Sequence, residues 1–232
     1  NFNIYYFILI GKVKDVIKNE ELKYYLLIVF VSIALIVMNI ASKYQSIWQC
    51  IRDVLFTVSS IITTTGYSTA DFGKWPLFSQ VILLLVMFFG ACAGSTAGGL
   101  KISRVIMMAK MYIAEIRQMI SPNRVITVKY EDKPLSAKMQ KNVAVYFVVY
   151  MILFTTMLLI VSFSLGDFIT AFSAVAATFN NIGPGLGKVG PAYSFADLNN
   201  VSKVVLSFGM LAGRLEIFPM LILFAPATWK LK

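Results

Sequence analysis

Residues 53–76 read DVLFTVSSIITTTGYSTADFGKWP, and residues 167–191 read DFITAFSAVAATFNNIGPGLGKVGP. Each run begins with an Asp, passes through a short stretch of small and apolar residues, and reaches a loop centred on Gly66 or Gly183 before a Pro. The apolar part of each run is too short to cross a bilayer, which needs about 20 helical residues. Such a segment favours a re-entrant helix that enters the membrane and returns as a loop.

Longer apolar segments flank these two short ones, which lie at 53–63 and 167–179. The longer segments lie at 24–42, 77–99, 143–163 and 201–226. Each of them approaches or exceeds the length of a membrane-spanning helix. The chain therefore repeats one pattern: spanning helix, short re-entrant helix, Gly loop, spanning helix. An internal repeat of this kind predicts an all-α integral membrane protein built from two tandem helix–pore loop–helix units.

The composition excludes an ordinary soluble domain and most enzyme chemistry. Apolar residues make up 58% of the 232 residues and charged residues 14%, and the mean hydropathy is +0.75. Histidine is absent and the only cysteines are Cys50 and Cys92. These facts argue against a zinc site of the usual ligand set, a Ser–His or Cys–His pair, and a disulfide framework. The first residues lack an initiator Met and a charged n-region, so we expect no signal peptide and expect a piece of a longer protein.

The positive charge follows the predicted topology. The chain has 21 Lys and Arg against 11 Asp and Glu. Fifteen of the basic residues fall on one side of the predicted spans, and Arg214 falls inside the last span. The five on the other side are Lys43, Arg52, Lys74, Lys188 and Lys203. The positive-inside rule therefore predicts cytoplasmic termini and a cytoplasmic connector at 101–141. Because the topology explains most of the positive charge, the charge does not indicate a protein that binds nucleic acid. The basic connector is also suited to anionic lipid or an acidic partner.

The two Gly loops have the properties of an ion filter. Extended backbone at membrane depth exposes carbonyl oxygens, and it is tolerated where it lines a water-filled or ion-filled cavity. Such carbonyls replace the hydration shell of a potassium ion in potassium filters. The run Thr64–Tyr67 looks like a relaxed version of the filter sequence TVGYG, and Asn181–Gly185 keeps the central glycine. The alternative is that both loops are ordinary turns between helices.

Four stretches resemble the Trk/Ktr/HKT-type potassium transporters, and within them the membrane subunit of the bacterial Trk system. They are TTTGYSTADF (63–72), GACAGSTAGGLKISR (90–104), FNNIGPGLGKVGP (179–191) and GRLEIFP (213–219). Members of this family have four helix–pore loop–helix repeats around one pseudo-fourfold pore. This sequence supplies two, so the resemblance implies the C-terminal half.

The same resemblance implies a division of the chain. Residues 1–23 would be a cytoplasmic segment trailing from the preceding repeat, and 24–120 would be one repeat, with its pore loop near 64–68 and a broken second helix. A cytoplasmic linker at 121–138, containing Pro122 and Pro134, would lead to the last repeat at 139–232, with its pore loop near 180–187.

The resemblance also assigns site residues. The implied selectivity filter consists of Thr64, Thr65, Gly66, Tyr67, Asn181, Ile182, Gly183 and Pro184, with K⁺ held at Thr65, Gly66, Ile182 and Gly183. The implied gate is an intramembrane loop containing Gly94, Ser95, Thr96, Ala97, Gly98 and Gly99, together with Arg214. The small residues of this run themselves favour unwinding of a helix, whereas glycines at a spacing of four also suit a helix-packing face.

Arg214 is a functional candidate on physical grounds as well, because a charge within a span is costly. By resemblance it faces the pore below the filter and acts as a positive barrier to cations. The alternative is a structural pair between Arg214 and Glu216.

The sequence thus predicts potassium uptake across a bacterial cytoplasmic membrane, with sodium as a second candidate ion and no catalytic site. One alternative is a two-pore-loop potassium channel subunit working as a dimer. Another is an intramembrane serine hydrolase using Ser95 with Lys101. The transported ion would be K⁺, with no tightly bound cofactor. The expected partners are membrane lipid, the N-terminal half of the same pore, a second copy in a homodimer and a cytosolic nucleotide-binding regulatory subunit, but not nucleic acid.

Overall fold

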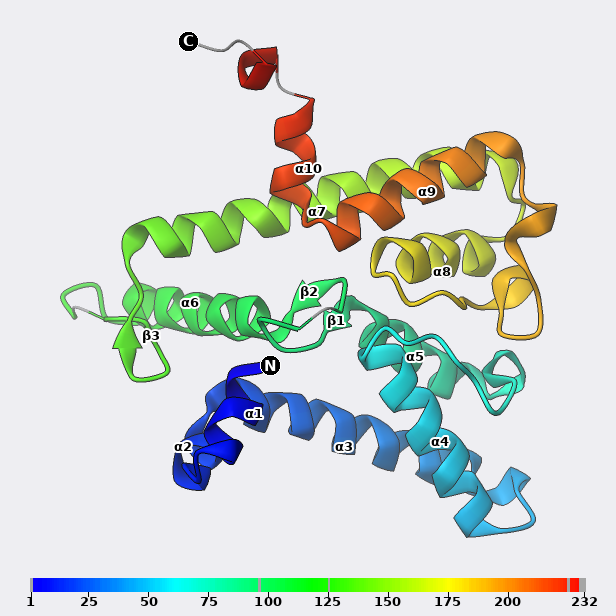
Figure 1. Cartoon of the computed structure of the whole chain (residues 1–232), viewed down its shortest axis with the longest axis horizontal. Coiled ribbons are helices and arrows are strands. Elements are labelled where there is room, and N and C mark those ends of the chain that lie inside the picture. Colours follow the sequence, from blue (N-terminus) through cyan, green and yellow to red (C-terminus); the bar gives the residue numbers. More distant parts are fainter. Residues whose placement is uncertain (1, 96, 125, 225, 230–232) are drawn as a thin grey trace.

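The computed structural model of the chain describes residues 2–95, 97–124, 126–224 and 226–229. It is a helical structure with two short pairs of strands (Figure 1). The helices are α1 (Phe2–Leu9), α2 (Val13–Lys18), α3 (Glu20–Ile40), α4 (Ile47–Ile62), α5 (Leu77–Phe88), α6 (Ile102–Ile120), α7 (Ala137–Ser164), α8 (Phe168–Phe179), α9 (Asn200–Arg214) and α10 (Ile217–Leu223). The strands are β1 (Phe89–Gly90), β2 (Leu100–Lys101), β3 (Lys129–Tyr130) and β4 (Lys133–Pro134).

Two units of three helices form the body of the protein. Helices α3, α4 and α5 pack together, and α7, α8 and α9 form the second group (Figure 1). In each group the middle helix is the predicted short one. Helices α5 and α8 connect the groups, where the ring of Phe88 lies 5.3 Å from that of Phe154 and 6.0 Å from that of Phe172. The all-α repeat architecture predicted from the sequence is confirmed.

Two of the four predicted spans are single long helices. Residues Glu20–Lys43 and Ala137–Ser164 are, among the described residues, the helices long and apolar enough to cross a membrane. Their outward faces are apolar: Phe30 is 65% exposed on α3 and Phe163 is 96% exposed on α7. Apolar side chains exposed along a whole helix are suited to lipid.

The other two predicted spans are not single helices, and for the first of them a broken helix was predicted. The segment 77–99 is helical only to Phe88. The segment 201–226 is divided into α9 and α10, which meet at an angle of 117°. Glu216 at the junction has a φ of +66°, which a right-handed helix does not accommodate. Pro219 fits immediately afterwards because the first turn of a helix does not need its backbone N–H.

The predicted linker at 121–138 contains local structure and ends slightly earlier than expected. Strands β3 and β4 form an antiparallel hairpin. The turn residues Glu131 and Asp132 both have positive φ, as a two-residue type I′ turn requires. Helix α7 then begins at Ala137, because the Ser136 hydroxyl accepts a hydrogen bond from the backbone N–H of Met139 at 3.3 Å.

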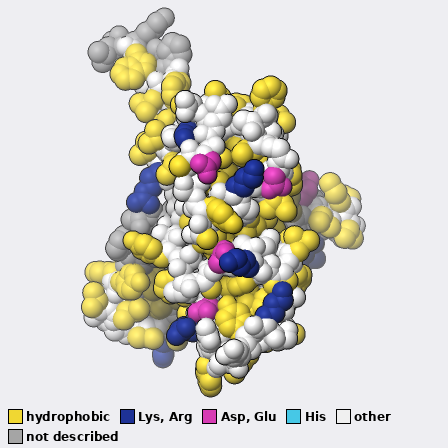
Figure 2. Space-filling view, turned by 90° about the vertical axis from the view of Figure 1, so that its right-hand side faces the viewer, with side chains coloured by type: hydrophobic (Ala, Val, Ile, Leu, Met, Phe, Trp, Pro, Cys, Tyr) yellow, Lys and Arg dark blue, Asp and Glu magenta, His cyan; other side chains and the backbone are white. Residues whose placement is uncertain are grey.

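The end of the molecule that carries the loops after α4 and α8 has mixed charge. Figure 2 shows basic and acidic side chains close together on this face. The ion pairs here include Arg52 with Asp53 and Lys74 with Asp71, both at 3.4 Å. Arg52 and Lys74 at this end therefore each have an acidic neighbour.

Candidate functional site

The two Gly loops follow the same backbone path. The carbonyl of Ser60 accepts hydrogen bonds from the N–H groups of Thr65 at 2.9 Å and Gly66 at 3.4 Å. The carbonyl of Ala177 accepts the equivalent bonds from Ile182 at 2.8 Å and Gly183 at 3.4 Å. A shift of 117 residues relates the two sets, from 60 to 177 and from 66 to 183. The repeat seen in the sequence is therefore a repeat of backbone geometry.

Positive φ angles occur at the same places in both loops. Thr64 and Gly66 have φ of 56° and 81°, and their equivalents Asn181 and Gly183 have 58° and 111°. Left-handed conformations at alternate positions turn the chain sharply after each short helix. Glycine adopts them without the steric cost that a Cβ adds, which explains the glycine at the centre of each loop.

The two loops touch each other at Gly66. A Cβ built on Gly66 would overlap the backbone carbonyl oxygen of Ile182, and it would lie 3.3 Å from Cδ of Pro184. Only a residue without a side chain permits this approach. The predicted filter residues of the two repeats are thus brought together by the fold.

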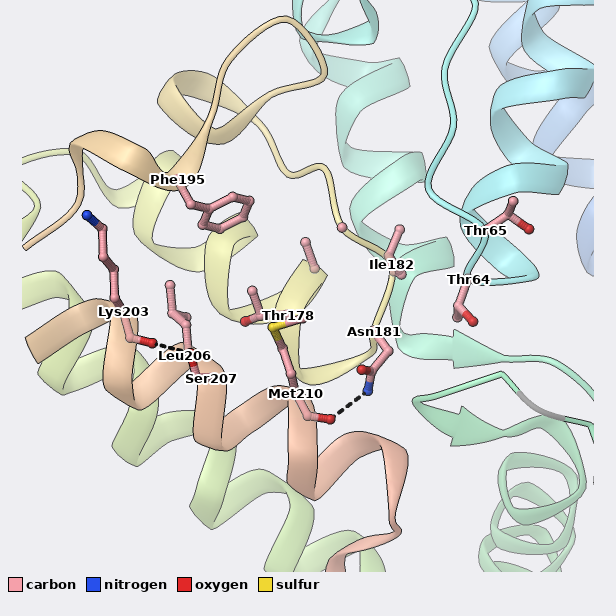
Figure 3. A pocket seen from close by; sticks show the side chains of 12 residues that line it. Thr64, Thr65, Thr178, Asn181, Ile182, Phe195, Lys203, Leu206, Ser207 and Met210 are labelled. Carbon is pink, nitrogen blue, oxygen red and sulfur yellow. Dashed lines mark hydrogen bonds between the residues drawn. The ribbon is translucent and has the colours of Figure 1, made fainter. Parts of the chain in front are cut away.

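A cavity of about 480 Å³ lies beside the loops (Figure 3). Thr64 and Thr65 lie on one side of it, and Thr178, Asn181 and Ile182 lie on another. Helix α9 closes a third side, where the Asn181 amide donates a hydrogen bond to the carbonyl of Met210 at 3.1 Å. Both predicted filter loops therefore line one space.

The two loops differ in their exposure. Ile182 is buried at 4% exposure, whereas Thr65 is exposed and Tyr67 is 74% exposed. Gly183 is also exposed, and nothing lies within 4 Å of a Cβ built on it. The first loop in particular presents an open edge.

The aspartates that begin the two sequence runs are not equivalent. Asp167 caps α8, with its carboxylate accepting the backbone N–H groups of Ile169 and Thr170 at 3.4 and 3.1 Å. Asp53 lies inside α4, which begins at Ile47, and it is only 6% exposed. The sequence alignment of these two residues was therefore wrong, because α4 extends further ahead of its loop than α8 does.

The glycine-rich run after α5 is a loop. Its two ends pair as parallel strands, with Phe89 opposite Leu100 and Gly90 opposite Lys101. Gly94 and Gly99 have φ of 72° and 74°, outside the helical range. Unwinding at this run was predicted and the helix-packing alternative is wrong. Thr96 lies outside the described residues.

Two charged side chains hold this loop, which was predicted to lie within the membrane. The Lys101 ammonium donates to the carbonyls of Ser95, at 3.1 Å, and Ala97. The Glu21 carboxylate, 2% exposed, accepts the N–H groups of Ala93 at 2.6 Å and Ser103 at 3.2 Å. Glu21 thereby connects α3 to both ends of the loop. Sequence reasoning missed Glu21, since an acidic residue in a first helical turn is ordinary.

The loop after α5 lies against the C-terminal end of α8. A Cβ on Gly98 would lie 2.5 Å from the carbonyl oxygen of Asn180, and one on Gly99 would lie 2.9 Å from its side-chain oxygen. Asn180 is fully buried and accepts a hydrogen bond from the Tyr150 hydroxyl at 2.7 Å. A Cβ on Gly213 of α9 would overlap the carbonyl of Phe179. The loop meets the end of α8 at Asn180, and α9 meets it at Phe179 and Asn181. Sequence reasoning missed Asn180.

A second cavity, of about 460 Å³, reaches the same loop from the other side. Its lining includes Thr63, which directly precedes the first Gly loop, and Cys92, Ser95 and Ala97 of the loop after α5. The intramembrane loop is therefore adjacent to the base of the first pore loop as well.

Arg214 is exposed at the C-terminal end of α9. Its neighbour Glu216 forms an ion pair with Arg104 of α6 at 2.8 Å. The guanidinium of Arg104 also lies 4.0 Å from the ring centroid of Tyr146. The sequence suggested Arg214 as the partner of Glu216, and it did not suggest Arg104.

Ser95 and Lys101, the residues of the hydrolase alternative, do lie together, with Nζ 3.4 Å from Oγ. The same ammonium group donates to two backbone carbonyls, however, which is the role of a structural cation. A general base must instead present a free lone pair.

Two tandem repeats of helix, pore loop and helix, together with an unwound intramembrane loop, define a membrane protein of the pore-loop class. A profile described as TrkH, cation transport protein, matches residues 22–231. The chain belongs to this family of ion transporters, as the sequence motifs predicted, and the hydrolase alternative is set aside.

Individual relatives agree. The chain is 36% identical over 234 residues to the Trk system potassium uptake protein TrkH of Escherichia coli K12, covering 99% of this chain and 48% of that protein. It is 35% identical to TrkG of the same organism, covering 99% and 47%. The crystal structure of the potassium transporter TrkH from Vibrio parahaemolyticus matches with a TM-score of 0.89 at 36% identity, covering 99% and 50%. The chain spans about half the length of these relatives.

Proposed function

We propose that this chain supplies two of the four quadrants of a pore that takes up potassium across the bacterial cytoplasmic membrane. The single observation that carries the proposal is the contact between two geometrically equivalent Gly loops, at Gly66 and Ile182. Two walls of a carbonyl-lined filter require this arrangement. The names of the relatives, which are potassium uptake proteins, support potassium as the ion.

In the proposed mechanism, backbone carbonyls of Thr65, Gly66, Ile182 and Gly183 replace the hydration shell of K⁺. The loop residues Thr64, Tyr67, Asn181 and Pro184 hold these carbonyls in place, and sodium is the ion that the filter must discriminate. The membrane potential supplies about 2.3 kcal/mol per charge for each 100 mV, which drives accumulation without a catalytic step.

The intramembrane loop and Arg214 would form the gate. The loop lies against Asn180 and lines the cavity beneath Thr63. These contacts support a role in which the loop obstructs ions that leave the filter toward the cytoplasm. Arg214, at the end of α9, would add a positive charge to the same path. The residues assigned to the loop gate are those from Gly94 to Gly99.

The remaining quadrants would come from the N-terminal half of the same protein. We further propose that the protein forms a homodimer in membrane lipid and that both ends of this chain are cytoplasmic. A cytosolic nucleotide-binding regulatory subunit would bind the side that carries the basic connector at 101–141. The relatives are named as proteins of a Trk system, which supports the proposal of a separate regulatory subunit. The excess of Lys and Arg in the 101–141 connector supports the orientation.

The experiment is potassium uptake by the full-length protein in a potassium-requiring strain, with Na⁺ and Rb⁺ as competitors. We expect growth on low potassium and weak competition by Na⁺. A parallel experiment places residues 1–232 alone in liposomes, where we expect no selective flux because two filter walls are absent. Selective flux from this chain alone would favour the dimeric two-pore-loop channel and would contradict the half-pore proposal.

A further inference from the structure

A cleft of about 730 Å³ lies between α6, the start of α7 and α10, away from the filter loops. Its polar lining comprises Ser103, Arg104, Lys141 and Asn142. The rest of the lining is apolar, with Met107 and Phe218 among its members. The cleft thus combines two cationic side chains with a hydrophobic wall.

Arg104 has unused hydrogen-bonding capacity in this cleft. Its Nη2 donates to Glu216, and its guanidinium lies over the ring of Tyr146. Its Nη1 is buried and has no hydrogen-bond partner among the described residues. A buried donor without an acceptor is costly, and the cost is greater when the donor is charged. The Arg104 side chain as a whole is 23% exposed and lines the cleft, so an anionic group bound there would lie beside its positive charge.

A second, narrower cleft of about 260 Å³ adjoins the first and shares Arg104, Val143 and Tyr146 with it. Apart from Arg104 and the ring of Tyr112, this second cleft is lined by apolar residues such as Phe89 and Phe147. The guanidinium of Arg104 therefore lies where the first cleft, which has polar residues in its lining, meets the second, apolar cleft. This combination suits an amphiphile with a charged head.

The neighbouring surface of α7 favours a lipid as the source of that head. One turn beyond Lys141 the helix carries exposed apolar residues: Val145 is 41%, Val148 56% and Ile152 59% exposed. Lys141 therefore lies where the apolar face of a spanning helix begins, at the level that basic side chains take at a membrane interface. Free phosphate has no apolar part that could occupy the apolar cleft.

We propose that these clefts bind an anionic phospholipid, with its phosphate at Arg104 and Lys141 and an acyl chain along Val143, Tyr146 and the apolar cleft. Basic pockets between spanning helices on the cytoplasmic side are suited to such headgroups. The site rests on the proposed membrane placement but not on the filter assignment, so its test is independent of ion selectivity.

The test uses the delipidated full-length protein and native mass spectrometry with phosphatidylglycerol, phosphatidylcholine or inorganic phosphate. We expect retention of phosphatidylglycerol over phosphatidylcholine. Lys141→Gln should weaken phosphatidylglycerol binding about fivefold, because one basic residue contributes about 1 kcal/mol to binding an anionic lipid surface. Lys138→Gln is the matched control, since Lys138 has the same charge on the same helix but does not line either cleft.

Equal retention of the two lipids, or equal effects of Lys141→Gln and Lys138→Gln, would overturn the proposal. Competition by inorganic phosphate at concentrations matching the lipid would show a simple anion site and would also overturn it. Arg104→Gln provides a second variant, and Lys141→Gln keeps the test decisive if that variant fails to fold.

Discussion

Gly66 lies so close to the backbone carbonyl of Ile182 that no side chain fits between the two Gly loops. Residues 116 positions apart in the chain, 66 and 182, thus join two adjacent walls of the proposed filter. By contrast, the equivalent glycine, Gly183, faces open space and is distinguished by its φ of 111°. The two glycines are therefore needed for different reasons, and their variants should behave differently.

Gly66→Ser should reduce the preference for K⁺ over Na⁺ more than Gly183→Ser does. Both changes place a Cβ in a conformation that costs about 1–2 kcal/mol, but only the first also pushes a carbonyl of the other loop. Competition of potassium uptake by Na⁺, measured in the full-length protein at matched expression, checks this. Unchanged competition in both variants would remove the filter assignment.

Gly98→Ala should alter gating while leaving ion preference intact. The new methyl group would lie 2.5 Å from the carbonyl oxygen of Asn180, so the intramembrane loop must move away from the pore helix. Uptake rate at saturating K⁺ is the measurement, alongside Na⁺ competition. Gly166→Ala is the control, because nothing lies within 4 Å of its Cβ position. Normal rates in both variants would mean that the loop does not gate.

Glu21→Ala should loosen the intramembrane loop and raise the leak of cations. The change leaves the N–H groups of Ala93, partly buried, and Ser103, buried, without this acceptor, at a cost of up to about 1–3 kcal/mol each. Ion flux in proteoliposomes without stimulation reports the leak. Glu20→Ala serves as the comparison, since Glu20 instead pairs with Lys110 at 2.5 Å. Equal leak in the two variants would contradict the role of Glu21 in holding the loop.

Arg214→Ala should raise flux per folded molecule. A positive charge on the ion path opposes a cation by about 4 kcal/mol at 4 Å if the effective dielectric constant is near 20. Glu216 retains its ion pair with Arg104, so this variant does not strand it as a buried charge. Uptake normalised to membrane protein level measures the effect, with Arg214→Lys as the charge-preserving control. Reduced normalised uptake would exclude the barrier role.

Stability at low pH should depend on Asp167. Hydrogen bonds from the Thr170 hydroxyl and backbone lower the pKa of Asp167 below the ordinary 3.8. The stabilisation is therefore complete above that pH and is lost as pH falls through the lower pKa of the folded state. Asp167→Asn keeps a helix cap but cannot titrate. As the pH is lowered below 3.8, the thermal midpoint of this variant in detergent should therefore fall less than that of the unmodified protein. Parallel curves for the two proteins would contradict this.

The local features were predictable because their causes are local. The short apolar lengths of α4 and α8, the glycines at 66 and 183, and the unwound run after α5 all follow from composition over a few residues. The helix bounds at the junction of α9 and α10 were not predictable from the sequence, because the positive φ of Glu216 follows from its tertiary position.

What the sequence by itself determined is a membrane protein with two pore-loop repeats and a broken helix after the first, since hydropathy, segment length and glycine position act within each segment. Only the tertiary structure decided which charges meet. Glu216 reaches Arg104 across 112 positions, and Glu21 reaches Ala93 and Ser103 across 72 and 82. A buried charge such as that of Glu21 needs a partner to be stable, and the partners of both glutamates are chosen by how the helices pack, which no local pattern encodes.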